Sequence, residues 1–149
     1  MKKSEEQSDI EKTLSKIPKS HRGLLRGYDF KLHSGNTLNG DDDHIGYMDA
    51  EEEEIAVAAP WNYGREFATL HEIAHVVWEH LGKDIKREWQ KLVNKTKKKH
   101  NQKPHVQSDS LDQSAEEIFC MCYANYYTKH KLATYSHPEW LKFIENLPK

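Results

Sequence analysis

The sequence predicts an α+β domain in which a small sheet of about three strands packs on helices and the C-terminal half is mostly helical. Three observations support this class. Residues 28–32 alternate in polarity with the period of a strand. Apolar residues recur at helical spacing through residues 67–81. Helix start and stop signals recur after residue 82. At 149 residues, the chain is long enough for one domain with a single core.

The N-terminal third contains two short predicted helices and three short predicted strands. Ser8-Asp9-Ile10-Glu11 has the form of a capping box, and the apolar stripe that follows it ends at Pro18. A second helix is expected around residues 19–26. The expected strands are Tyr28–Leu32, His44–Met48 and Glu54–Ala58. We therefore expect residues 1–17 to form a polar, helical segment ahead of a domain at residues 18–147.

Four helices are expected in the remainder of the chain. The first, Gly64–Leu81, carries an apolar stripe and both histidines of the motif described below, and Gly82 ends it. The next two are Asp84–Thr96 and Gln113–Lys129. The last opens with Ser136-His137-Pro138-Glu139, which supplies a cap, an early proline and a glutamate at capping-box spacing.

Composition and charge argue against several classes of protein. The formal net charge is −2, which argues against nucleic acid as the main partner. No apolar run reaches membrane-spanning length, and the basic start of the chain has no apolar segment behind it, so we expect neither a membrane span nor a secretion signal. Cys120 and Cys122 lie two residues apart in one predicted helix, where they do not easily bridge. These features predict a cytoplasmic protein, although export without such a signal stays open, and they do not specify an oligomeric state.

The stretch that bears most on function is His71-Glu72-Ile73-Ala74-His75. Two histidines one helical turn apart leave the same face of a helix and can bind one zinc ion, with Glu72 close to a metal-bound water. Such a site needs a third protein ligand and an open position for water. The alternative is a surface helix that carries His71 and His75 as ordinary polar residues.

A third ligand is available in the predicted helix at residues 113–129. Glu116 and Glu117 open that helix 41 and 42 residues after His75, which leaves room for one intervening helix and a loop. Two histidines, a glutamate and a water form an established hydrolytic set for zinc. The alternative for either glutamate is a favourable interaction with the helix dipole alone.

The chain here resembles the gluzincin zinc peptidases, and within them the catalytic domain of anthrax lethal factor and its small relatives. The matching positions are residues 70–77 with Glu79, then Glu117-x-Phe119-x-x-x-Tyr123, with residues 140–144 as added support. The resemblance covers about residues 18–147. It implies a zincin-like metallopeptidase domain with Zn²⁺ as cofactor. It also implies the roles of four residues: His71, His75 and Glu117 as metal ligands and Glu72 as the general base.

Two positions depart from the family pattern. The family often has a second acid one turn after the ligand glutamate, where this chain has Met121. A tyrosine that stabilises the reacting oxygen usually lies seven residues before the ligand, where this chain has Ser110. Three other residues are candidates for that role: His105, Tyr126 and Tyr63. The departures bear on catalytic efficiency more than on metal binding.

Further expectations concern residues around the motif. Glu79 either steadies a ligand histidine through its second ring nitrogen or is an exposed acid, and Glu116 is expected to face solvent or to lie near the helix start. The family places the strand before the motif helix, here Glu54–Ala58, at the edge of the cleft, where an extended peptide can pair with it. Residues 41–54 hold eight acids and no Lys or Arg. They predict a mild preference for basic peptides, unless they are only a solvated surface.

The sequence therefore predicts a zinc-dependent endopeptidase that acts on one or a few protein partners. Two alternatives stay open. One is a repressor-cleaving regulatory peptidase of the kind found in mobile elements. The other is a weak or inactive binding module that keeps the zinc or only the fold, which Met121 and Ser110 favour.

Overall fold

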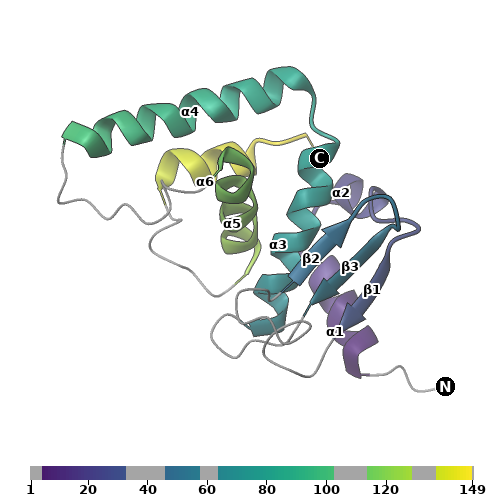
Figure 1. Cartoon of the computed structure of the whole chain (residues 1–149). Helices are drawn as coiled ribbons and strands as arrows, with labels where there is room; N and C mark the ends of the chain where they lie inside the picture. The colour runs from purple at the N-terminus through teal and green to yellow at the C-terminus, as the bar shows by residue number, and fades with distance from the viewer. Residues whose placement is uncertain (1–4, 33–45, 58–63, 103–113, 129–136, 149) are drawn as a thin grey trace.

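The computed structural model describes residues 5–32, 46–57, 64–102, 114–128 and 137–148, which form six helices and one three-stranded sheet (Figure 1). The elements in chain order are α1 (Glu5–Leu14), α2 (Lys19–Gly23), β1 (Asp29–Leu32), β2 (Gly46–Asp49), β3 (Glu54–Val57), α3 (Gly64–Glu79), α4 (Lys83–Gln102), α5 (Ala115–Tyr127) and α6 (Pro138–Glu145). The predicted α+β class is confirmed, with a small sheet ahead of a mostly helical C-terminal half.

The sheet is mixed, and its strand order is β1-β3-β2. β3 runs parallel to β1 and antiparallel to β2, so that Ile55 lies opposite Phe30 on one side and Met48 on the other. Both sides of β3 are thus paired within the sheet, so the expectation that an extended peptide pairs with the strand before the motif helix is wrong for residues 54–57. Ile55, Ala56 and Val57 are fully buried, and a continuous apolar run of this kind suits a central strand covered on both faces.

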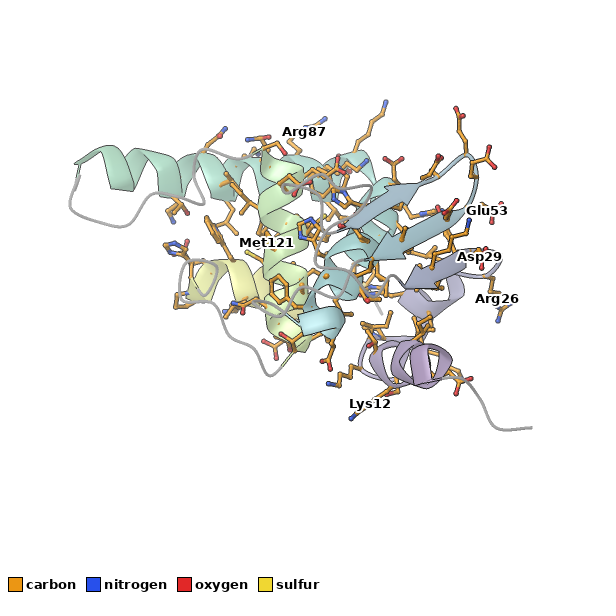
Figure 2. All side chains as sticks on the ribbon, turned by 60° about the horizontal axis from the view of Figure 1, so that its bottom comes forward. Lys12, Arg26, Asp29, Glu53, Arg87 and Met121 are labelled. Atoms are coloured by element: carbon orange, nitrogen blue, oxygen red, sulfur yellow. The ribbon has the colours of Figure 1, made fainter. Side chains whose placement is uncertain are left out.

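The turn between β2 and β3 uses part of the acidic stretch. The Asp49 carboxylate accepts the backbone N–H groups of Glu51 and Glu52 at 3.0 and 3.2 Å, as an aspartate at a turn commonly does. Glu53 has a φ of 50°, and its carbonyl accepts the Asp29 N–H over 2.7 Å, which brings Asp29 and Glu53 to the same end of the sheet (Figure 2). Some of these acids therefore shape the chain locally.

α3 is the central element of the fold. It packs against β2 and β3 on one side and against α5 on the other (Figure 1), and α1 also contacts it, with an ion pair between Lys16 and Glu66. From Phe67 to Val77 every residue is buried except His71 and His75, which are partly exposed. The predicted apolar stripe was therefore too narrow, because a helix covered on most of its circumference is apolar nearly all round.

An aromatic cluster joins the C-terminal helices. The ring of Trp89 on α4 lies 5.7 Å from Phe119 on α5, and 6.1 and 5.0 Å from Trp140 and Phe143 on α6, measured between ring centroids. Such rings contribute much of the apolar area buried in a small core. Cys120 and Cys122 are free and buried within α5, so they belong to this packed interior.

Several predicted boundaries shift by a few residues. α1 begins at Glu5, so Ser8 lies inside the helix and is not its cap. α6 has His137 at the N-cap and Pro138 at its first position, while Ser136 falls outside the described residues. α4 is longer than the predicted Asp84–Thr96, and α2 is shorter than residues 19–26. Among the described helices, none combines the length and the apolar character needed to cross a membrane.

Candidate metal centre

The two histidines of the motif lie one turn apart on α3. Their side chains are 16% and 15% exposed, and their ring centroids are 5.2 Å apart. Because the neighbouring positions on α3 are buried in the core, the backbone under both imidazoles is held by packing on the sheet and on α5. The helix therefore presents two imidazoles from a fixed support.

α5 places the predicted third ligand against both of them. Ser114 caps the helix, and its hydroxyl oxygen accepts the Glu117 N–H over 3.2 Å. The Glu117 carboxylate lies 3.1 Å from His71 Nε2 through Oε2 and 3.0 Å from His75 Nε2 through Oε1. The described residues thus bring together His71, His75 and Glu117 as expected from the sequence.

These three side chains fit the requirements of a zinc site. Imidazole nitrogen and carboxylate oxygen are common zinc ligands, and two ligands at 2.0–2.2 Å from a tetrahedral ion lie about 3.3 Å apart. The measured nitrogen-to-oxygen separations of 3.0 and 3.1 Å are close to that value. The Glu117 side chain is 42% exposed, so this carboxylate is partly accessible to solvent among the described residues. The donor set therefore suits a hydrolytic centre with three protein ligands.

Glu72 lies beside the histidines in a buried position. Its Oε2 is 3.8 Å from His71 Nε2, and one ligand atom from each of Glu72, His71 and His75 lies within 4.8 Å of the others. Burial raises the pKa of the Glu72 carboxyl, and the charge of Glu117 adds to this, while the two histidines oppose it. A carboxyl with a raised pKa next to a cluster of metal-type ligands is suited to proton transfer.

The site carries a strong internal charge pairing when no ion is bound. Burial lowers the pKa of His75, but hydrogen bonds to Glu117 and Glu116 outweigh it and raise the pKa to about 9. Hydrogen bonds from His71 and His75 hold the pKa of Glu117 well below its ordinary range. Without an ion, His75 is therefore protonated near pH 7 and Glu117 is ionised.

The second nitrogen of each ring has a partner of its own. Glu116 Oε2 lies 2.6 Å from His75 Nδ1, and Met121 Sδ lies 2.9 Å from His71 Nδ1. Both partners come from α5, where Figure 2 labels Met121. Glu116 lies in the first turn of its helix, which is one of the two expected positions, and its side chain is 35% exposed and contacts His75.

Glu79 takes no part in this arrangement. It is exposed at the end of α3, and its charge contributes to the raised pKa of Tyr28, where burial is the larger cause. Of the two expectations for Glu79, the one that holds is the exposed helix acid. In the sequence, the sign for Glu116 was its place next to Glu117 in the same helical turn. That place alone does not tell which glutamate is the metal ligand and which contacts the second nitrogen of a histidine.

Tyr123, one of the residues on which the resemblance rests, makes buried contacts within the fold. Its hydroxyl lies 2.8 Å from His21 Nδ1, and His21 Nε2 accordingly reaches the Pro148 carbonyl over 2.9 Å. Tyr123 and His21 are buried, so this chain of contacts joins α2, α5 and the C-terminal end.

Tyr126 is the one candidate for stabilising the reacting oxygen that lies among the described residues. Of the three candidates, His105 and Tyr63 lie outside the described residues, as does Ser110, which stands at the position of the family's tyrosine. Tyr126 is half-buried on α5, with its ring 4.8 Å from that of Tyr127 in an edge-on arrangement.

Comparisons of this chain with protein-family models, with curated proteins and with solved structures give no match in any of the three. Its function therefore has to be inferred from the geometry around residues 71–75 and 114–121.

Proposed function

We propose that this protein is a zinc-dependent peptidase of the gluzincin type, which hydrolyses peptide bonds in one or a few protein partners. The observation that carries the proposal is the Glu117 carboxylate within 3.1 Å of the Nε2 atoms of both His71 and His75. A buried Glu72 beside these groups adds the proton-transfer function that hydrolysis needs.

His71, His75 and Glu117 would hold the zinc ion. When bound, zinc lowers the pKa of a coordinated water towards about 7 and polarises the carbonyl to be cleaved. Glu117 is ionised in the ion-free protein, as a carboxylate ligand must be. Loading the site requires His75 to give up its proton, since a ligand imidazole must be neutral.

Glu72 would act as the general base and then as the general acid. Its carboxylate receives a proton from the attacking water and passes that proton to the leaving amine. In the ion-free protein burial raises the pKa of Glu72, so desolvation favours the protonated form of this carboxyl. The low exposure of Glu72 also limits exchange of that proton with bulk solvent.

The sheet offers β2 as a place for an extended substrate. Among the described strands β2 lies at an edge of the sheet, and it packs against α3, so a peptide could add to it by backbone pairing, in place of the central strand at residues 54–57. The exposed residues 51–53 follow β2 directly and support a mild preference for basic peptides. A panel of peptides that differ only in charge tests this preference, and equal cleavage of acidic and basic versions would contradict it.

A second candidate function is that of a zinc-binding interaction module. The observation that favours it is Met121, a thioether at the position of the family's second acid, in contact with His71. In that case the protein binds zinc and a partner but cleaves nothing.

One experiment separates these functions. The full-length protein is purified without chelators, its zinc content is measured, and new protein N-termini are compared in cells that carry either the wild type or Glu72→Gln. The peptidase proposal expects one equivalent of zinc in both proteins and new N-termini only with the wild type. Equal sets of N-termini with zinc present favour the binding module, and a metal-free wild type contradicts both.

A further inference from the structure

The two histidines of the metal centre are held in different ways. Both Nε2 atoms face the same Glu117 carboxylate, whereas the two Nδ1 atoms point to different partners. His75 Nδ1 lies 2.6 Å from a carboxylate oxygen of Glu116, and His71 Nδ1 lies 2.9 Å from the sulfur of Met121. The same α5 helix therefore supplies an anionic partner to one imidazole and a thioether to the other.

This difference matters for metal binding. An imidazole that binds a metal through Nε2 carries its proton on Nδ1, and the group that accepts this Nδ1–H fixes the tautomer and the orientation of the ring. A carboxylate accepts such a bond strongly, while a thioether sulfur is a weak acceptor. His75 is thus held more firmly than His71.

The helical turn that carries Glu116 is anchored by two contacts of its own. Ser114 caps the helix at this point, and the Ala115 carbonyl accepts the indole N–H of Trp89 over 2.7 Å. Glu116 and Glu117 are consecutive residues of that anchored first turn, and both reach His75, one at each ring nitrogen. Glu79, the other acid considered for this role, is exposed at the end of α3.

We propose that Glu116 is a positioning residue that holds His75 for zinc binding through its Nδ1 atom. The proposal rests on the zinc site proposed above. It assigns Glu116 no contact with substrate, and its effect passes through His75.

The test is zinc affinity, measured on the full-length protein by competition with a coloured chelator. Glu116→Ala is expected to weaken zinc binding about 10- to 100-fold, the usual effect of losing such a supporting group. Glu116→Gln keeps an acceptor oxygen but loses the charge, so its loss should be smaller and in the same direction. Glu79→Ala is the matched control, because it removes an exposed glutamate from the partner helix, and its affinity should equal that of the wild type.

A second measurement tests the route of the effect. In a His75→Ala background the Glu116→Ala change should no longer alter zinc affinity, whereas in a His71→Ala background the loss should persist. A general structural effect of Glu116 would weaken binding equally in both backgrounds, which would overturn the proposal.

The remaining outcomes also decide. A Glu116→Ala affinity equal to that of Glu79→Ala overturns the positioning role while leaving the zinc site in place. If Glu116→Ala does not fold, Glu116→Gln replaces it, and an unchanged affinity of that variant has the same meaning. A wild type that binds no zinc overturns both proposals. Zinc binding without peptide cleavage removes only the peptidase function, and the role of Glu116 is then decided by affinity.

Discussion

Trp89 on α4 donates its indole N–H to the backbone carbonyl of Ala115, the first residue of α5, over 2.7 Å. Ala115 is followed directly by Glu116 and Glu117. The helical turn that supplies both carboxylates is therefore anchored from a third helix that contributes none of the proposed site residues. Since Trp89 is fully buried, this anchor is shielded from water.

The first prediction concerns this anchor. Trp89→Ala should lower the free energy of unfolding by about 3–5 kcal/mol, the usual cost of deleting a buried large aromatic ring. Trp89→Phe keeps an aromatic ring but removes the indole donor from the Ala115 carbonyl, and the loss of one hydrogen bond costs about 0.5–1.5 kcal/mol. Urea unfolding of the metal-free protein measures both changes. A loss for Trp89→Phe as large as that for Trp89→Ala would show that the hydrogen bond, and not the ring contacts, dominates.

The second prediction concerns the general base. Glu72→Gln is nearly isosteric but cannot take up a proton, so cleavage should fall about 10²- to 10⁴-fold while the zinc content stays at that of the wild type. The measurements are the rate of cleavage of a substrate found from the new N-termini and metal analysis of the same samples. Wild-type rates in the variant would exclude this role for Glu72.

The third prediction concerns the ligands. Glu117→Ala and His75→Ala should each lose the equivalent of zinc that the wild type retains through purification, because two protein ligands hold zinc much more weakly than three. Glu139→Ala is a suitable control, since Glu139 is an exposed acid on α6. Retention of zinc by Glu117→Ala would place the third ligand elsewhere.

The fourth prediction concerns the pH dependence of the metal-free protein. The folded pKa of His75 is about 9, above its ordinary value of 6.5. Its contribution to stability is therefore fully present below pH 6.5 and is lost as the pH rises towards 9. The pKa of Glu117 is lowered, so its contribution is present above its ordinary value of 4.5 and is lost in acid. The free energy of unfolding in the presence of a chelator should be highest near pH 5–6.5.

Above pH 6.5, zinc should reverse the fall in the free energy of unfolding with rising pH. Because zinc must displace the proton of His75, its binding becomes stronger as the pH rises from 6.5 to 9. Unfolding experiments with zinc should thus show a growing gain over the same range. The His75→Gln variant is the control. Between pH 6.5 and 9 it should show neither the loss of stability seen without metal nor the growing gain seen with zinc. A metal-free wild type whose stability is flat from pH 6.5 to 9 would contradict the charge pairing with Glu116 and Glu117.

The fifth prediction separates structure from chemistry at Tyr123. Tyr123→Phe removes the hydroxyl that lies 2.8 Å from His21 Nδ1, so the free energy of unfolding should fall by about 1 kcal/mol. Zinc affinity and cleavage should not change, because Tyr123 is buried and contacts α2 and the C-terminal end. A large loss of cleavage with unchanged stability would instead assign Tyr123 to the reaction.

The sequence predicted the elements better than their arrangement. Apolar spacing through residues 67–81 predicted α3, because that spacing is a short-range pattern. The contact of Glu117 with the two histidines was expected from the resemblance to the gluzincin peptidases, and not from a local pattern. The position of residues 54–57 in the middle of the sheet was missed, since strand order depends on pairing between distant segments. The buried run Ile55-Ala56-Val57 was the available sign of a central strand.

Glu116 shows why part of the site was out of reach of sequence reasoning. Any glutamate in a first helical turn is favoured by the helix dipole, so its presence needs no further cause. Its contact with His75 depends on how closely α5 packs against α3 and on how the helix is rotated about its own axis, and neither quantity is encoded in a local pattern. Met121 was noticed as a departure from the family, but its contact with His71 Nδ1 depended on the same packing.

The Glu117 carboxylate on α5 contacts His75 on α3, which lies 42 residues earlier in the chain. An ion shared by His71, His75 and Glu117 would act as a removable cross-link that closes a long loop containing the whole of α4. An ion that binds only the folded chain stabilises it by mass action, so the cofactor would add to the heat resistance of the molecule. A shortage of the metal would then lower the stability of the protein and increase its proteolysis in the cell, in addition to removing the proposed activity.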